Sequence, residues 1–408
     1  MAHGAGRPAT IGTASAPVRP GFILLVSALM SMGAMTIDVN LPAIPAVAAE
    51  LGGSLASAQL TVTSFFVGFA VGQIFIGPLS DRFGRKPVLL WGIALFVLAS
   101  LACLLATDID TLLLLRMLQG LAGATGPILS RAVVRDLFEG AVMARVMSFV
   151  MAAFITAPII APTIGAGLLA LGSWRWIFAF LALYGLAMLA WTALQLRETR
   201  RFPDPGALHP TRILAGYRAL LGNRRSCRYA IVTILTFVTL IVYLTNVPVI
   251  YMALFGIGPG GFAVMFALTA ACAALGSLAN ARLVRFLPLP RVIASGSAGA
   301  FASGLLNLGV AAIGPSSGWF LVPGFGAFFF CFSLIVSNST ALALQPHGRT
   351  VGGVVSALGV LQSFIPALVG SALAAFSNGS PFPTLLTMAA LPLAGAAMSW
   401  RDRAQPPS

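Results

Sequence analysis

Apolar residues along this chain gather into twelve long runs that are separated by short polar stretches. Each run has the length of a membrane helix, because about twenty apolar residues cross the hydrocarbon core of a bilayer. Glycine and proline recur inside the runs, and membrane helices tolerate both residues. We therefore expect twelve transmembrane helices, at residues 21–43, 57–79, 87–106, 111–132, 147–170, 176–196, 229–253, 260–283, 291–313, 318–343, 351–376 and 383–400.

The longest polar interruption, 197–228, is rich in arginine and divides the runs six and six. This layout predicts an all-α integral membrane protein with two pseudo-symmetric six-helix bundles, 21–196 and 229–400. The interruption itself is expected to be a basic cytoplasmic linker held near anionic lipid. The polar ends, 1–20 and 401–408, are expected to form a disordered cytoplasmic arm and a cytoplasmic tail.

A weak internal repeat supports the division into two halves. Gly77-Pro-Leu-Ser-Asp81, at the end of the second run, is mirrored by Gly276-Ser-Leu-Ala-Asn280 at the end of the eighth. Glycine suits close contact between membrane helices, so we expect such a contact at both positions. The acid of the first copy is an amide in the second, which indicates that the halves are no longer equivalent.

Composition excludes a soluble fold. The chain is 58% hydrophobic and 8% charged, with a mean hydropathy of +0.96, whereas an ordinary soluble protein is about 25% charged. The net charge of +14 does not indicate a nucleic-acid partner, because the positions of the charges matter more than their sum. All but two of the 24 basic residues fall on one side of the predicted membrane, Arg116 and Arg175 being the exceptions. This asymmetry places both termini in the cytoplasm.

Charged residues are rare inside the runs, and two of them are candidates for function. Asp38 is the one acid within a predicted span, so it is the candidate proton site. Arg116 lies in the fourth span, where an arginine costs about 2.5–3.5 kcal/mol and needs a partner or water. Counted from the outer ends of their spans, both residues lie about six positions deep, so we expect them to face each other. Gln119 shares a helical face with Arg116 and is expected to join Asn40 or a substrate.

Other chemistry is missing from the sequence. The cysteines share no metal-ligand spacing, so neither a metal site nor a disulfide is expected. No histidine falls in a predicted span, no set of residues suited to membrane enzyme catalysis is present, and there is no phosphate-binding loop. We therefore expect no enzymatic activity, no cofactor and no need for ATP.

A ten-residue segment carries the first resemblance to a known family. Gly77-Pro-Leu-Ser-Asp81-Arg82-Phe-Gly84-Arg85-Lys86 resembles the signature between helices two and three of the major facilitator superfamily. The resemblance implies the major facilitator fold and a function in transport. A carboxylate and several basic side chains at a helix end can form a charge-assisted latch, so we expect a cytoplasmic gating motif of Gly77, Asp81, Arg82, Gly84, Arg85 and Lys86, together with Arg135 and Asp136.

Further segments resemble proton-coupled antiporters of that superfamily. Arg116-Met-Leu-Gln119-Gly120-Leu-Ala-Gly123 resembles their helix-four motif, and 157–167 resembles their helix-five motif through Pro158, Pro162 and Gly165. The segments 38–45, 134–138 and 174–178 are similar to the bicyclomycin/chloramphenicol-resistance (Bcr/CflA) branch of drug:proton antiporters. Membership would imply multidrug efflux across the bacterial cytoplasmic (inner) membrane by a monomer, with small molecules and protons as partners in the lipid bilayer.

In the superfamily fold, helices one, four, seven and ten line the cavity. The residues that this implies for the substrate cavity are Asp38, Asn40, Arg116, Gln119, Tyr243, Asn246, Phe332 and Asn338. Four phenylalanines fall within five residues of the tenth run, so one helical face cannot hold them all, and packing is the better interpretation for any one of them. An aromatic, nearly uncharged wall suits neutral or amphiphilic drugs.

The mechanistic hypothesis is that Asp38 alternates between a proton and an ion pair with Arg116 or a polar substrate, as the bundles rock. The alternative role for the pair is a permanent brace within the bundle. The alternative functions are export or import of an endogenous metabolite by the same fold, and an uncoupled, transporter-like membrane sensor.

Overall fold

The computed structural model describes residues 20–200, 202–376 and 380–400 of the chain, and over these residues it contains helices and no strand. Twelve helical segments are long and apolar enough to span a bilayer, which confirms the predicted number of spans. The predicted arm before residue 20 and the tail 401–408 lie outside the described residues.

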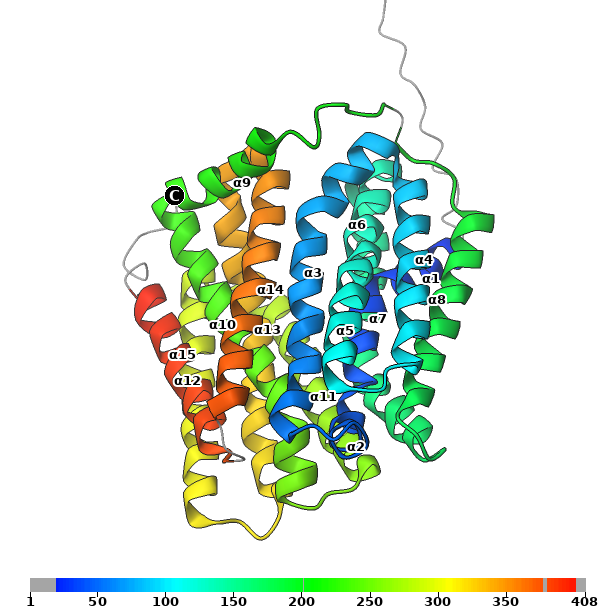
Figure 1. The fold of residues 1–408 in the computed structure, drawn as a ribbon. Coiled ribbons are helices and arrows are strands. Elements are labelled where there is room, and N and C mark those ends of the chain that lie inside the picture. Colours follow the sequence, from blue (N-terminus) through cyan, green and yellow to red (C-terminus); the bar gives the residue numbers. More distant parts are fainter. Residues whose placement is uncertain (1–19, 201, 377–379, 401–408) are drawn as a thin grey trace, which may run out of the picture.

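The helices form two bundles joined by a linker helix (Figure 1). The N bundle contains α1 (Pro20–Asp38), α2 (Ile44–Glu50), α3 (Leu55–Phe83), α4 (Arg85–Leu104), α5 (Ile109–Gly123), α6 (Thr125–Leu137), α7 (Gly140–Leu169) and α8 (Arg175–Gln195). The linker helix is α9 (Pro210–Gly222). The C bundle contains α10 (Arg224–Pro248), α11 (Pro259–Leu283), α12 (Leu289–Ile313), α13 (Val322–Leu344), α14 (Val351–Phe376) and α15 (Phe382–Trp400).

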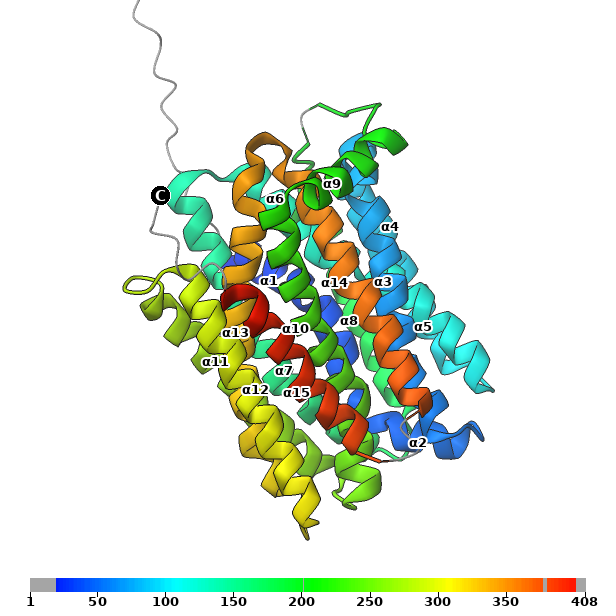
Figure 2. The same cartoon turned by 90° about the vertical axis from the view of Figure 1, so that its left-hand side faces the viewer.

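Four short helical turns extend or connect these helices. They are the 3₁₀ turns η1 (Leu41–Ala43), η3 (Gly318–Leu321) and η4 (Gln345–Thr350), and the π-helical turn η2 (Val249–Leu254). We call the end of the bundles at which α9 lies the linker end; it is at the top of Figures 1 and 2.

The two bundles meet along two pairs of helices, α3 with α14 and α7 with α11. The helices α3 and α7 are the second and fifth spans of the N bundle, and α11 and α14 are the second and fifth spans of the C bundle. Each pair therefore joins a second span to a fifth span, as expected for two bundles related by a pseudo-twofold axis. Since most packing lies within a bundle, each bundle is a compact unit, and the two pairs are the surfaces along which one unit can move against the other.

The first span is longer than predicted and is interrupted. Pro42 has no backbone N–H to donate to the carbonyl of Asp38, so the α-helix cannot continue through it unchanged. The chain passes through η1 and resumes as α2, and the helical path ends at Glu50 rather than near residue 43. The fourth span is likewise composed of two helices, α5 and α6, which meet at Ala124.

The closest helix contact in the N bundle joins α3 to α5. A Cβ added to Gly120 would lie 2.0 Å from the carbonyl oxygen of Phe65, and one added to Gly68 would lie 1.8 Å from that of Met117. The two backbones therefore touch, with no space for side chains between them. The corresponding helices of the C bundle, α11 and α13, make the same kind of contact at Gly276.

The expected close helix contact is present at one of the two repeat glycines, Gly276, and not at the other, Gly77. A Cβ on Gly276 would lie 2.3 Å from the carbonyl oxygen of Phe330, whereas one on Gly77 would meet no atom within 4 Å. The α3–α5 crossing lies nearer the middle of α3, at Gly68 and Gly72, so Gly77 is beyond the point where the two helices touch.

A methyl group at the α3–α5 crossing tests this packing. We expect Gly120→Ala to lower the apparent melting temperature in detergent by several degrees, since overpacking a close contact costs about 1–3 kcal/mol. Gly167→Ala is the control, because its Cβ would meet nothing within 4 Å and alanine favours a helix. Equal melting temperatures for the two variants would contradict the contact.

Candidate transport site

Asp38 occupies the last position of α1, close to the surface where the bundles meet. Its side chain is buried, at 4% exposure, and makes no hydrogen bond or ion pair with any residue in the described ranges. On the side of the C bundle, α10 contacts the turn η1 that follows Asp38. From the other side, α7 packs directly on the next peptide, since a Cβ on Gly165 would lie 2.1 Å from the carbonyl oxygen of Val39.

The helix-five motif therefore supports the backbone beside Asp38. Gly165 allows the contact, and α7 continues as one helix through both Pro158 and Pro162. The role of these residues in directing transport stays a prediction.

Three further buried polar atoms near this bundle junction have no hydrogen-bond partner among the described residues. They are Asn40 Oδ1, the Thr245 hydroxyl and the Tyr251 hydroxyl. They belong to the connection after α1, to α10 and to η2, and these segments contact one another through η1 and α2. Buried polar atoms are nearly always paired, so each of these atoms is able to bind a water molecule or a polar ligand group.

Arg116 is fully buried and lies inside the N bundle. Its Nη1 donates to Gln119 Oε1 at 2.6 Å and its Nε donates to the carbonyl oxygen of Thr61 at 3.3 Å. The guanidinium carbon lies 4.9 Å from the ring centre of Phe65 and 5.8 Å from that of Phe178. Carbonyl oxygens and aromatic faces thus stabilise the charge, with no carboxylate among the described residues. The remaining nitrogen, Nη2, is buried and has no hydrogen-bond partner in these ranges.

Among the described residues, no ion pair joins Asp38 to Arg116, so this conformation has neither the expected pair nor the permanent brace that was its alternative role. Two features explain the difference. Asp38 lies twelve positions from the end of its span at Glu50, whereas Arg116 lies seven from the start of α5, a difference of roughly 7 Å along a helix. Arg116 also faces α3 and α8 rather than α1.

Gln119 binds within the N bundle and does not approach Asn40 by hydrogen bond. Its side-chain oxygen accepts from Arg116, and its Nε2 donates to the Ser100 hydroxyl of α4 at 2.8 Å. The amide therefore joins α5 to α4 and holds the guanidinium in place.

The four cavity residues expected in the C bundle are mostly engaged within it. The Tyr243 hydroxyl is 3.2 Å from the Thr269 hydroxyl, and its ring packs on Phe325 and Phe329 at 5.0 and 4.9 Å between ring centres. Phe332 packs on Phe237, Phe328 and Phe329. Asn338 donates to Asn280 Oδ1 at 2.6 Å, which ties α13 to the repeat motif of α11.

Two glutamines that the sequence analysis did not select make polar contacts between the bundles. Gln59 Nε2 donates to the carbonyl oxygen of Thr245 and to Oδ1 of Asn246, each at 3.1 Å. Gln73 Nε2 donates to the Ser363 hydroxyl at 2.8 Å. Both glutamines lie in α3, and an amide inside an apolar span is itself a sign that a partner exists.

The predicted gating residues gather at the linker end of the N bundle. Arg85 is their centre: its Nη2 lies 2.9 Å from Asp81 Oδ1, its Nε lies 3.0 Å from Asp136 Oδ2, and its Nη1 donates to the Ser80 hydroxyl at 2.5 Å. Gly84 has φ +100°, which lets the chain turn from α3 into α4. Three helices, α3, α4 and α6, are thus held together by one guanidinium.

The other predicted gating side chains lie outside this ion-pair group. Lys86 Nζ donates to the carbonyl oxygen of Ala193 in α8 at 2.8 Å. Arg82 lies over the ring of Phe83. Arg135 is in the last turn of α6 and is exposed. Gly77 makes no close contact, as described above.

Glu198, at the start of the linker, completes the cluster and was not predicted. Its carboxylate accepts from the backbone N–H groups of Arg85 and Lys86 at 2.9 and 3.1 Å, so it caps the start of α4, which Gly84 cannot cap. Thr199 donates to Asp136 at 3.2 Å, and Arg200 lies 3.4 Å from Asp81. The beginning of the linker is therefore bonded to the gating cluster.

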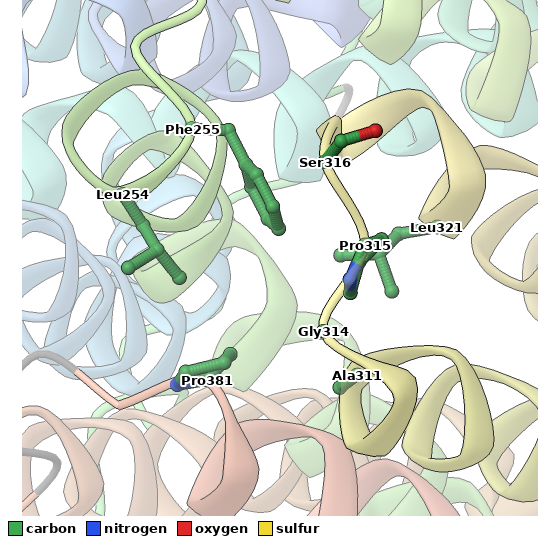
Figure 3. A pocket seen from close by; sticks show the side chains of 8 residues that line it. All are labelled: Leu254, Phe255, Ala311, Gly314, Pro315, Ser316, Leu321 and Pro381. Atoms are coloured by element: carbon green, nitrogen blue, oxygen red, sulfur yellow. The ribbon is translucent and has the colours of Figure 1, made fainter.

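A shallow pocket of about 390 Å³ lies at the opposite end of the C bundle (Figure 3). Its lining comes from the end of η2 and the residue after it, from the end of α12, the following connection and η3, and from the residue before α15. Its lining residues are Leu254, Phe255, Ala311, Gly314, Pro315, Ser316, Leu321 and Pro381, none of which is charged. It holds none of the predicted site residues and is separate from Asp38.

Two six-helix bundles that meet along equivalent pairs of helices have the architecture of membrane transporters built from repeats. Residues 23–371 match the family described as the Major Facilitator Superfamily, and the chain belongs to this superfamily.

Relatives of known description extend over most of the chain. It is 29% identical over 376 residues to the bicyclomycin resistance protein homolog of Haemophilus influenzae, covering 90% of this chain and 92% of that protein. It is 29% identical over 343 residues to multidrug resistance protein MdtL of Escherichia coli, which covers 84% of this chain and 85% of that protein. It is also 29% identical to the uncharacterized MFS-type transporter YdgK of Bacillus subtilis, over 86% of this chain and 87% of that protein. The recognition of the family from its motifs is confirmed.

Solved structures share the fold. The partially occluded inward-open structure of the xylose transporter XylE from E. coli aligns with a TM-score of 0.71 at 14% identity, over 93% of this chain and 97% of that one. A D-xylose-proton symporter structure aligns with a TM-score of 0.73, also at 14% identity and over the same shares of the two chains.

The capping role of Glu198 leads to a measurable expectation. In Glu198→Ala, the amides of Arg85 and Lys86 lose their acceptor, and a lost cap costs about 1 kcal/mol. We expect roughly fivefold faster hydrogen exchange in the peptide that contains the start of α4. Glu139→Ala is the control, since Glu139 is exposed at the same end and its carboxylate has no hydrogen bond among the described residues. Unchanged exchange in the first variant would refute the cap.

Proposed function

We propose that this protein is a proton-coupled exporter of small neutral or amphiphilic molecules of the bicyclomycin and chloramphenicol type, with Asp38 as its proton site. The observation that carries the proposal is the position of Asp38: an acid buried at the bundle junction without a hydrogen bond or an ion pair among the described residues. The descriptions of the relatives as bicyclomycin and multidrug resistance proteins support the substrate class.

The free energy of burial explains why such an acid suits proton coupling. An isolated carboxylate is costly to bury, whereas a protonated carboxyl group carries no charge and can remain. Asp38 therefore keeps its proton while it is buried, as it is here, and releases it when water or a polar substrate group reaches the junction. Proton transfer is thereby tied to the opening of the site.

The structure favours one of the two partners considered for the ionised form of Asp38. Arg116 belongs to the same bundle and faces away from α1, so a rocking motion of whole bundles does not bring the two together. A substrate that enters between the bundles reaches Asp38, Asn40 and the hydroxyl of Thr245 without any change inside a bundle. We assign Arg116 to the support of α5 and to the positive potential of the N bundle.

Alternating access requires the polar contacts between the bundles to break and re-form. Gln59 with Asn246 and Gln73 with Ser363 are the bonds that opening has to exchange for water or substrate. One proton moving down 100 mV supplies about 2.3 kcal/mol, enough for roughly a fiftyfold gradient of a neutral substrate. A proton gradient alone can therefore drive export.

Proton flux is the first test of this function. In proteoliposomes with an imposed pH gradient, we expect amphenicols or bicyclomycin to trigger proton movement through the native protein and none through Asp38→Asn. Asp110→Asn is the control, because Asp110 is an exposed acid in the first turn of α5. Flux that persists in Asp38→Asn would remove Asp38 as the proton site. Absence of triggered flux in native protein would favour the transport of an endogenous metabolite or an uncoupled sensor.

The orientation in the bacterial inner membrane is part of the proposal. Arginines are concentrated at the linker end, so the positive-inside rule places this end, with both termini, in the cytoplasm. In a background with the four native cysteines replaced by serine, a membrane-impermeant maleimide applied to intact cells should label Leu105→Cys and leave Arg285→Cys unlabelled. Both residues are exposed, Leu105 at the end opposite the linker. The reverse labelling pattern would invert the orientation.

A further inference from the structure

The linker helix α9 has one face that is fixed to the C bundle. Gly216 and Leu220, one turn apart, are buried against α14 and its surroundings. A Cβ on Gly216 would lie 2.3 Å from the carbonyl oxygen of Gly353, so the two backbones are in contact. The helix crosses the linker ends of α14 and α10 on the outer side of the C bundle (Figures 1 and 2). Its position and orientation are therefore fixed by packing.

A second face of α9 has no partner among the described residues. Leu214, Arg218 and Leu221 occupy positions i, i+4 and i+7, which places them in one stripe along the helix. Leu214 and Leu221 are 49% and 61% exposed, and Arg218 is exposed without an ion pair. Exposed leucines can enter the boundary of the acyl chains, and the long side chain of an arginine between them can extend its charged group back to the headgroups.

The start of α10 adds two exposed basic residues directly after α9. Asn223 Oδ1 accepts from the backbone N–H of Ser226 at 3.0 Å and so ends the linker by capping α10. Arg224 and Arg225 follow immediately, are exposed and have no ion pair with a described residue. They stand directly before the apolar part of a transmembrane helix, at the depth where lipid headgroups lie.

Arg212 shows that not every arginine of α9 belongs to this surface. It is directed to another side of the helix and is paired with Asp204, its Nη1 lying 2.6 Å from Oδ2. The backbone N–H of Gly206, with Arg212, lowers the pKa of the Asp204 carboxyl, which keeps that pair ionised. Arg218 is therefore the arginine of α9 that has no ion pair with a described residue and shares a stripe with Leu214 and Leu221.

We propose that Leu214, Arg218 and Leu221 of α9, with Arg224 and Arg225 of α10, form a binding surface for the phosphate groups of anionic lipids in the adjacent leaflet. The leucines enter the boundary of the acyl chains, and the arginines reach the phosphates, each worth about a fivefold gain in binding. This surface is independent of the proton site and of the transported substrate.

Photo-crosslinking tests the surface directly. The full-length protein is reconstituted into bilayers that contain a diazirine-bearing phosphatidylglycerol or phosphatidylcholine, irradiated, digested with chymotrypsin and mapped by mass spectrometry. We expect peptides from 210–228 to carry at least about fivefold more phosphatidylglycerol than phosphatidylcholine adduct. The variant Arg218→Gln/Arg224→Gln/Arg225→Gln should lose this preference, and the matching lysine variant should keep it.

A second triple variant controls for total charge. Arg282→Gln/Arg285→Gln/Arg291→Gln removes three exposed arginines from the same end of the C bundle and should leave the preference of 210–228 intact. Equal labelling by the two lipids, or an equal loss in both glutamine variants, would overturn the proposal. Because the readout is lipid labelling, its failure is distinguishable from failure of transport.

Discussion

The hydrocarbon core of a bilayer offers no hydrogen-bond partners, so each polar group inside the protein needs a partner from the protein itself. Arg116 has much of this support from a glutamine, a backbone carbonyl and two aromatic faces, although its Nη2 has no partner among the described residues. The Asp38 carboxyl group is also buried and makes no hydrogen bond or ion pair with a described residue. The contrast separates a guanidinium held inside one bundle from an acid at the bundle junction, and the proposed mechanism depends on that separation.

The two bundles differ in what holds each together and what holds them to each other. Within the N bundle, α3 and α5 touch backbone to backbone at Gly68 and Gly120, and α11 and α13 do so in the C bundle. Between the bundles, the polar contacts of α3 are made by Gln59 and Gln73. Backbone contacts cannot slide without steric overlap, whereas an amide hydrogen bond can be exchanged for one with water. Motion is therefore directed to the bundle interface.

The linker is attached to both bundles beside this interface. Its first residues, around Glu198, are bonded to the cluster of Arg85 at the end of the N bundle, and its helix α9 is packed on α14 of the C bundle. Since α14 is also the partner of α3, the linker contacts both bundles next to one of the two helix pairs at their interface. Composition alone describes this segment as a basic loop, but the described part of it is hydrogen-bonded to one bundle and packed on the other.

Local patterns were sufficient to predict the number of spans, the six-plus-six division, the superfamily and the single acid within the membrane. These features depend on hydrophobic length and on motifs of neighbouring residues, which are properties of short stretches of chain. The same reasoning placed Asp38 and Arg116 together, because it ended the first span near residue 43 and left open which side of α5 carries the guanidinium.

Tertiary packing decided the partners. Arg116 meets Thr61 because α3 and α5 cross at their glycines, Glu198 caps a helix that begins more than a hundred residues earlier, and Gln59 reaches Asn246 across the bundle interface. The direction in which a side chain points around a helix depends on which neighbour that helix packs against. A span pattern read from sequence is nearly the same for every such arrangement, so the sequence by itself determined which residues enter the membrane, and the fold determined which of them meet.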